Sequence, residues 1–318
     1  MKIVSVINYK GGVGKTALTA NLAAELAWHD KRILMLDLDP QTSLTFSFIL
    51  PDIWERDFSG APTLTGTSSP DFTIKAWLES FDGRPPVDLA SLIHTPERAQ
   101  RRLQAKGRLD LISSHLGLIN VDLELATSLA GGTLAQVKRN FIMLHTRLAR
   151  GLSSIDQSAY DLVLIDCPPN FNIITKMAII ACDYILVPAR PDFLSTLGID
   201  YLIRNVNQLI TDFNDFAGMR HGDQVNPIDP KVLGVVFTMI QEYGGQPISA
   251  QRQYISRVGQ MPGITVFPSY IKRNDTLFAD APESGVPVVL NAYSSGSHQS
   301  VVEGLEGVAA TIGSALGI

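Results

Sequence analysis

The sequence predicts an α/β fold with three layers, in which a mostly parallel, twisted sheet lies between helices on both faces. Short apolar runs alternate with longer helical stretches along the 318 residues, and this alternation is typical of parallel strands joined by right-handed crossovers. A glycine-rich turn separates the first strand from the first helix. The composition, 45% hydrophobic and 18% charged, is that of a globular protein with an extensive core.

The domain organisation follows from the same pattern. Neither an internal repeat nor an interdomain linker is visible, so we expect one elaborated domain over residues 1–318. Its least regular part is an insertion at about 51–108, which is rich in Gly, Pro, Ser and Thr near residues 59–70.

The first elements are a buried strand at 3–7, a glycine-rich stretch at 9–16 and a helix at 17–27. This order is the setting of a phosphate-binding loop, because glycines let backbone N–H groups approach phosphate oxygens and the helix adds its positive end. Lys15 would then contact the β- and γ-phosphates, and the Thr16 hydroxyl would bind Mg²⁺. The alternative, a plain glycine turn with an incidental pair of lysines, leaves the two motifs below unexplained.

A second buried strand at 33–37 is closed by the sequence Asp37-Leu38-Asp39-Pro40-Gln41. In parallel sheets ligands bind at the carboxyl ends of the strands. We therefore expect Asp37 and Asp39 at the same edge as the phosphate loop. The alternative is a helix N-cap and a turn aspartate.

A buried strand at 161–166 delivers one carboxylate, Asp166, at its tip, and Cys167-Pro168-Pro169 follows. This is the Walker B arrangement, in which the carboxylate holds Mg²⁺, often through water. Another strand, at 109–113, brings His115 to the same edge, where we expect a structural role for it.

The remaining elements are read from periodicity. We expect helices at 72–81, 95–108 (basic), 116–152 (broken at 131–132), 173–181, 195–213, 249–258 and 299–316. We expect strands at 184–188, 232–238 and 264–267, and loops at 216–230 and 241–247.

Charge and cysteine content narrow the class of protein. A net charge of −5 and a pI near 5.7 exclude a generally basic nucleic-acid binder, so any DNA contact must come from a local patch. The 2 cysteines, Cys167 and Cys182, are expected to be reduced thiols. We see neither a signal peptide nor a membrane span, and we expect a cytoplasmic protein.

Three separated motifs, at residues 10–16, 37–41 and 161–169, resemble those of the ParA/MinD family of ATPases, which carry a deviant Walker A loop. The second motif looks like the ParA branch, and residues 273–288 are similar too. The resemblance covers nearly the whole chain except about 51–108. Tyr9 replaces the usual glutamine and Ala17 replaces a common threonine, but neither change removes a required group.

The resemblance implies a P-loop NTPase fold, ATP and Mg²⁺ as ligands, and slow, partner-stimulated hydrolysis of ATP to ADP and phosphate. Lys10 would reach across an ATP-dependent homodimer, Asp39 would position the attacking water, and Asp37 and Asp166 would join Thr16 at the metal. The implied nucleotide contacts are Lys10, Gly11, Gly12, Val13, Gly14, Lys15, Thr16 and Ala17, with Pro268 beside the adenine.

The resemblance also implies a role and partners. The family binds nonspecific DNA as a dimer, associates with the nucleoid and partitions plasmids or chromosomes with a ParB-like or cargo-adaptor partner. The candidate DNA-binding residues are Arg252, Arg257, Lys272 and Arg273. The alternative is that each of them is an ordinary surface charge.

Other functions of related proteins fit the sequence less well. A non-DNA cargo remains a variant of the same activity. A MinD-like membrane switch would need a basic amphipathic tail, whereas residues 301–318 contain Glu303 and Glu306 and neither Lys nor Arg. An iron–sulfur reductase would need cysteines at the ligand spacing, which Cys167 does not match.

A physical argument supports dimerisation. The γ-phosphate adds negative charge that the partner's ammonium group can neutralise, and ADP lacks this group. Hydrolysis would then remove the contact and release the dimer.

Overall fold

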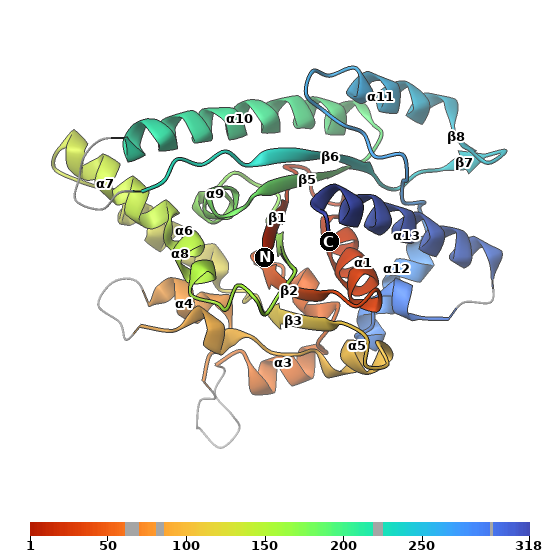
Figure 1. The fold of residues 1–318 in the computed structure, drawn as a ribbon, viewed down its shortest axis with the longest axis horizontal. Helices are drawn as coiled ribbons and strands as arrows, with labels where there is room; N and C mark the ends of the chain where they lie inside the picture. The colour runs from red at the N-terminus through yellow and green to blue at the C-terminus, as the bar shows by residue number, and fades with distance from the viewer. Residues whose placement is uncertain (61–69, 81–85, 219–224, 293–294) are drawn as a thin grey trace.

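The computed structural model describes residues 1–60, 70–80, 86–218, 225–292 and 295–318. Six parallel strands form its main sheet in the order β3-β2-β4-β1-β5-β6. Helices lie on both sides of this sheet (Figure 1). The strands are β1 (Lys2–Val6), β2 (Arg32–Asp37), β3 (Arg108–Ile112), β4 (Leu162–Asp166), β5 (Tyr184–Ala189) and β6 (Lys231–Phe237).

Each strand supplies apolar side chains to both faces of the sheet. In β2, Ile33 and Met35 belong to one buried cluster, and Leu34 and Leu36 belong to the other. Successive side chains of a strand point to opposite faces, so a strand covered on both sides reads as an unbroken apolar run. The predicted fold class, a parallel sheet between two helical layers, is confirmed.

The helices divide between the two buried clusters. One cluster contains residues of α1 (Lys15–Trp28), α2 (Ser43–Phe46), α3 (Pro51–Asp57), α5 (Glu97–Arg102), α12 (Asp275–Ser284) and α13 (Gly296–Leu316). The other contains residues of α4 (Ile74–Glu79), α6 (Leu118–Thr127), α7 (Leu134–His145), α8 (Arg147–Ser153), α9 (Ile173–Ala181), α10 (Phe193–Ala217) and α11 (Ser249–Gly259).

Some expected elements differ in extent. The basic helix ends at Arg102, because Gln104 and Ala105 adopt positive φ angles of 53° and 67°. Helix α10 runs past Phe213 to Ala217. Residues 241–247 hold a short hairpin, β7 (Glu242–Tyr243) with β8 (Gln246–Pro247), instead of a loop. Most of the stretch at 59–70, which is rich in Gly, Pro, Ser and Thr, lies outside the described residues.

Both outer edges of the sheet are covered by segments that are not strands of it. The backbones of His94 and Leu111 exchange two hydrogen bonds, of 3.1 and 2.9 Å, at the edge of β3. At the other edge Val235 bonds Thr265 and Phe267 through its N–H and carbonyl, at 2.8 and 2.9 Å. The strand expected at 264–267 is therefore only this one bridge onto β6.

Candidate functional site

The loop between β1 and α1 has the backbone geometry that a phosphate requires. Gly12 and Gly14 have φ angles of 70° and 77°, in the left-handed region that favours glycine. A Cβ atom placed on Gly11 or Gly12 would meet nothing within 4 Å, so the space beside the loop is open. Helix α1 starts at Lys15, and the N–H groups of its first turn point toward that space.

Two polar side chains outside the loop hold it in place. Thr238, just after β6, donates its hydroxyl to the carbonyl of Val13 at 2.7 Å. Asn8 accepts the Lys10 N–H at 2.9 Å and donates to the carbonyl of Pro188 at 2.7 Å. The loop is thus fixed by the ends of β5 and β6 before any ligand binds, which lowers the cost of ordering it.

Strand register brings the loop and two carboxylates to one level. Val6 of β1 and Asp37 of β2 both pair with Asp166 of β4, the strand that lies between them. The Thr16 hydroxyl donates to Oδ2 of Asp166 at 2.7 Å, whereas Oδ1 of Asp166 is buried without a hydrogen-bond partner among the described residues. A buried carboxylate oxygen without a donor is costly, and a cation or its bound water would satisfy it.

Charges at this edge influence one another. Burial lowers the pKa of Lys15, and the nearby carboxylates of Asp166 and Asp39 oppose that shift. Burial raises the pKa of Asp166, the charge of Asp37 raises it further, and the Thr16 hydrogen bond and Lys15 oppose the rise. Three carboxyl groups thus lie near the ammonium group of Lys15, and a bound cation would favour the ionised form of Asp166.

Asp37 differs from Asp166 in its hydrogen bonds. Its Oδ2 accepts the N–H and hydroxyl of Thr45 at 2.8 and 2.7 Å, and its Oδ1 accepts the N–H of Asp39 at 3.1 Å. The Ser114 hydroxyl donates to the carbonyl of Asp39 at 2.7 Å. Asp37 thus fixes the segment that carries Asp39, while Asp166 keeps an oxygen available for a ligand.

These residues fit Mg²⁺ as it occurs with phosphates. Among the described residues there is no cluster of three or more His, Cys, Asp and Glu side chains able to hold a metal. Mg²⁺ is commonly bound by one or two carboxylates together with substrate phosphates and water. One free Asp166 oxygen beside the Thr16 hydroxyl matches that pattern.

Lys10 forms an ion pair within its own chain. Its Nζ lies 2.9 and 2.8 Å from the carboxylate oxygens of Asp192, which is the N-cap of α10 and accepts the N–H of Ser195 at 2.8 Å. Burial raises the pKa of Asp192, but the Lys10 and Ser195 hydrogen bonds outweigh it and hold the pKa below its usual value. Asp192 was not predicted as a site residue.

The other residues singled out in the sequence differ in their placement. Pro268 is exposed. It lies near the end of β6, because the N–H of Ile271, three residues later, donates to the carbonyl of Phe237 at 2.9 Å. His115 has a local structural contact, as expected, because its Nδ1 accepts the N–H of Gly117 at 2.8 Å. Cys167 and Cys182 are buried free thiols.

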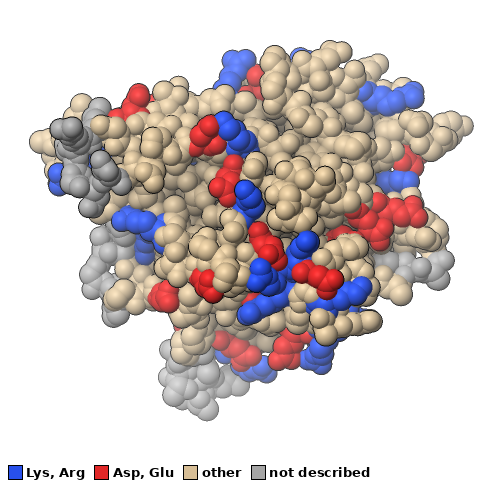
Figure 2. All heavy atoms as spheres, in the orientation of Figure 1, with Lys and Arg blue, Asp and Glu red and all other residues tan. Residues whose placement is uncertain are grey.

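The four candidate DNA-binding residues fall into two pairs. Lys272 is paired with Glu242 at 2.7 Å and Arg273 with Asp275 at 2.6 Å. Arg252 and Arg257 lie together on the surface of α11, and neither has a carboxylate partner among the described residues. Basic and acidic side chains are interspersed over the face shown in Figure 2.

Fold and loop together define the class of protein: a parallel sheet whose first strand leads through a glycine-rich loop into a helix with Lys15 and Thr16, opposite a strand-end aspartate, is a P-loop NTPase. The family model described as an AAA domain matches residues 1–217. The chain belongs to this family and, within it, to the ParA-like partition ATPases.

Named relatives agree with this assignment. The chain is 26% identical to the sporulation initiation inhibitor protein Soj of Bacillus subtilis, over 91% of this chain and 90% of that protein. It is 26% identical to the chromosome partitioning protein ParA of Caulobacter vibrioides, over 91% and 87%. The fold is similar to that of a Cyanothece McdA variant in complex with ATP, with a TM-score of 0.67, 21% identity and coverage of 100% and 97%.

Proposed function

We propose that this chain hydrolyses ATP slowly, dimerises when ATP is bound, and uses that cycle on nonspecific DNA to position a cargo such as a plasmid or chromosome. One observation carries the proposal: Lys15, Thr16 and Asp166 converge beside an open glycine loop that begins with a second lysine, Lys10. An ordinary phosphate loop needs only Lys15 of this pair to hold the phosphates.

Each residue has a distinct role in this proposal. Backbone N–H groups of residues 11–16 bind the phosphates, and Lys15 neutralises charge on the β- and γ-phosphates. Mg²⁺, when bound at Thr16 and Asp166, supplies electrostatic stabilisation of the transferred phosphoryl group. Asp39 lies in the segment held by Asp37 and Ser114 and orients the attacking water.

Lys10 provides the link between nucleotide and dimer. In the single chain its ammonium group is bound to Asp192, so it must leave this partner to reach a phosphate in a second subunit. The γ-phosphate of ATP is a stronger anionic partner for Lys10 than any group of ADP. Lys10 therefore exchanges Asp192 for the phosphate only when ATP is bound, and this exchange makes the dimer depend on ATP.

The test is the molar mass of the full chain by light scattering, with ADP or with a nonhydrolysable ATP analogue and Mg²⁺. We expect a dimer only with the analogue. Lys15→Ala is expected to lose nucleotide binding, whereas Lys10→Ala is expected to bind nucleotide and remain a monomer.

A matched control is Lys231→Ala, which removes an exposed lysine paired with Asp229. This variant should behave as the wild type does. A wild-type monomer in every nucleotide state, or a normal dimer of Lys10→Ala with normal hydrolysis, would contradict the proposed switch.

The DNA contact and the stimulating partner are further parts of the proposal. Arg252 and Arg257 are the better-placed pair, because their charges are not neutralised by a neighbouring carboxylate among the described residues. A ParB-like or cargo-adaptor protein would accelerate hydrolysis, and the ATP-bound dimer would reside on the nucleoid. The same cycle would also serve a non-DNA cargo.

The C-terminal helix gives no support to a membrane-bound variant of this cycle. Val301, Leu305, Val308 and Ile312 of α13 are buried against α1, so its apolar face is already covered. Within the described part of the chain, every helix is too short or too polar to cross a bilayer.

A further inference from the structure

The residues that lead into the phosphate loop are held by one segment of the chain, the end of β5 together with helix α10. Asn8 donates to a carbonyl at the end of β5, and Lys10 pairs with the N-cap residue of α10. Between them, the hydroxyl of Tyr9 accepts a hydrogen bond from the side-chain amide of Asn205, in the middle of α10, at 2.8 Å. The entrance of the loop is therefore attached to α10 at two separate points.

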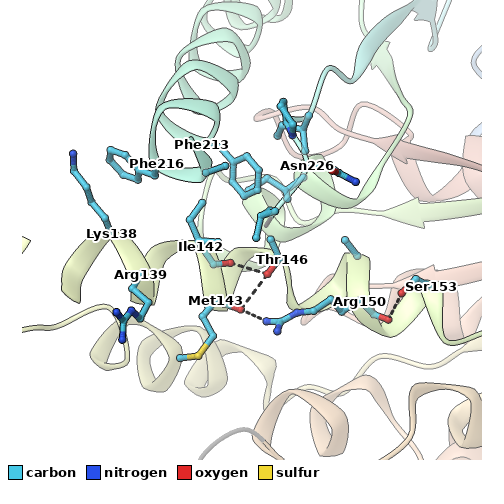
Figure 3. Close-up of a pocket in the computed structure, with 16 residues that line it drawn as sticks. Lys138, Arg139, Ile142, Met143, Thr146, Arg150, Ser153, Phe213, Phe216 and Asn226 are labelled. Carbon is cyan, nitrogen blue, oxygen red and sulfur yellow. Dashed lines mark hydrogen bonds between the residues drawn. The ribbon is translucent and has the colours of Figure 1, made fainter. Parts of the chain in front are cut away.

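Helix α10 is itself fixed at its far end. Asn214 exchanges two hydrogen bonds with the backbone of Ile228, at 2.9 and 2.8 Å. The ring of Phe216 meets the ring of Phe141 on α7 edge to face, with 5.3 Å between their centroids. Phe216 also lines a cavity of about 750 Å³ between α7 and this end of α10 (Figure 3). Because these contacts lie beyond Asn205, α10 gives the loop entrance a support that is anchored elsewhere in the fold.

The ring of Tyr9 packs against the loop that follows β4. Its centroid lies 5.7 Å from that of Phe171, and the two ring planes are at 89°, the edge-to-face arrangement that aromatic pairs prefer. Both side chains are half-buried at the margin of one apolar core. Phe171 closes the loop that starts at Asp166, so Tyr9 links this loop to the entrance of the phosphate loop.

The loop after Asp166 has little freedom between its ends. It contains two consecutive prolines, whose rings restrict the backbone. At its far end Asn172, the residue after Phe171, caps α9 by accepting a backbone N–H of the first turn at 2.9 Å. A change at Tyr9 is therefore transmitted through Phe171 to the residues beside Asp166.

We propose that Tyr9 is a positioning residue for ATP hydrolysis, whose ring holds the loop after Asp166 in register with the phosphate loop. This inference rests on the proposed function and extends it to a residue outside the phosphate-binding motif. The contact that Tyr9 maintains is the 2.7 Å hydrogen bond from the Thr16 hydroxyl to Asp166. A displacement of about 1 Å at a reacting group can slow an enzyme by about 10²-fold. When Lys10 leaves its N-cap partner, the bond of Tyr9 to α10 keeps the loop entrance in place.

The test measures ATP hydrolysis and nucleotide binding of the full chain. Tyr9→Ala should lower kcat about tenfold and change the nucleotide Kd less than about twofold, because residues 11–16 still bind the phosphates. Tyr9→Phe keeps the ring and should retain kcat within about threefold of the wild type. The matched control is Tyr243→Ala, which removes a tyrosine ring that is 87% exposed in the β7–β8 hairpin and should leave both constants as they are.

Two further measurements separate positioning from a general loss of structure. Phe171→Ala should lower kcat as Tyr9→Ala does, and the double variant should be no slower than either single variant, because the two rings act as one unit. Hydrogen–deuterium exchange of the nucleotide-free protein gives a readout that does not depend on hydrolysis. Peptides that cover residues 170–175 should exchange several-fold faster in Tyr9→Ala than in the wild type or Tyr9→Phe. Thermal unfolding confirms that each variant folds.

The outcomes distinguish this role from the proposed function. Unchanged kcat or unchanged exchange in Tyr9→Ala would overturn the role of Tyr9 and leave the ATPase proposal intact. Losses that multiply in the double variant, or Tyr9→Phe as slow as Tyr9→Ala, would also overturn it, because the effect would then not come from the paired rings. A wild type that does not hydrolyse ATP would overturn the proposed function and the role of Tyr9 with it.

Discussion

At the scale of single residues, the ammonium group of Lys10 has two competing uses. It is bound to Asp192 in the single chain, and the proposed dimer requires it at another subunit's nucleotide. The Lys10–Asp192 pair is only partly buried, and such pairs stabilise by about 0–1 kcal/mol. Its loss on dimerisation is therefore a small penalty that a γ-phosphate readily offsets.

This competition yields a prediction for Asp192→Asn. Asparagine can still accept the N–H of Ser195 and cap α10, but it no longer holds Lys10 by charge. We expect dimerisation at a several-fold lower concentration of the nonhydrolysable ATP analogue, measured by light scattering. The control is Asp200→Asn, which breaks an exposed pair with Arg204 on the same helix. An unchanged midpoint for Asp192→Asn would show that the pair does not restrain Lys10.

A second prediction concerns His145, which is buried in the core. Its Nδ1 bonds the carbonyl of Phe141 at 2.8 Å, while Nε2 has no partner among the described residues. Burial lowers the pKa of His145 from 6.5 to about 4. The unfolded chain therefore binds a proton that the folded chain does not between these values, and stability present above pH 6.5 is lost as the pH falls toward 4.

The measurement is chemical denaturation at a series of pH values. His145→Phe should flatten the decline over that interval by up to about 1.4 kcal/mol per pH unit. Gln253→Ala, a change at an exposed side chain that does not titrate, serves as the control and should leave the slope as it is. The same slope in His145→Phe and wild type would mean that His145 is not neutral in the folded state.

At the scale of elements, periodicity and context predicted the six strands of the sheet and the core helices. The strand expected at 264–267 was wrong, because its apolar residues cover the edge of β6 through one bridge and do not extend further. The extent of α5 depended on two residues with positive φ, which composition does not reveal. Helix α12 was missed because its sequence contains Pro282, a residue that usually ends or kinks a helix.

The candidate site was predictable where a motif carries the chemistry. Lys15, Thr16 and Asp166 lie together as the strand-loop-helix pattern requires. The residues that hold the loop were missed: Asn8, Thr238 and Asp192 come from separate strand ends and share no motif. Their only signal is a polar residue within three positions of the end of a buried strand, which many unrelated sheets also contain.

A prediction at this scale concerns the fit of β6 against its cover. Gly234 has a φ of 154°, and a Cβ there would lie 2.6 Å from the ring of Phe267 and 2.7 Å from the carbonyl of Thr265. Gly234→Ala should therefore destabilise the protein by about 1–3 kcal/mol in thermal or chemical unfolding. The same substitution at Gly198, inside α10 with nothing within 4 Å, should stabilise it by about 0.5–1 kcal/mol. Equal effects at both glycines would contradict the close contact.

At the scale of the whole molecule, a net charge of −5 means that DNA binding has to overcome general repulsion. We predict that Arg252→Gln/Arg257→Gln weakens binding of the ATP-bound protein to unrelated DNA sequences alike. It should also reduce the slope of log affinity against log salt by about 0.9 for each lost phosphate contact. Fluorescence anisotropy at several salt concentrations measures both.

The control for this experiment is Lys272→Gln/Arg273→Gln, whose charges are already neutralised by Glu242 and Asp275. It should have the smaller effect. If the control weakens binding more than the α11 variant does, the DNA surface lies at the ion-paired residues. No binding by the wild type in any nucleotide state would remove DNA from the proposed function.

The covered margins of the sheet have a consequence for assembly. Because His94 occupies the outer backbone groups of Leu111 in β3, and Thr265 and Phe267 occupy those of Val235 in β6, a strand from a neighbouring molecule would find its template interrupted at each margin. Filaments that grow by continuous strand addition are therefore disfavoured at both ends. Copies of this protein are left to meet through loops and helices, which a nucleotide can rearrange and which can separate again.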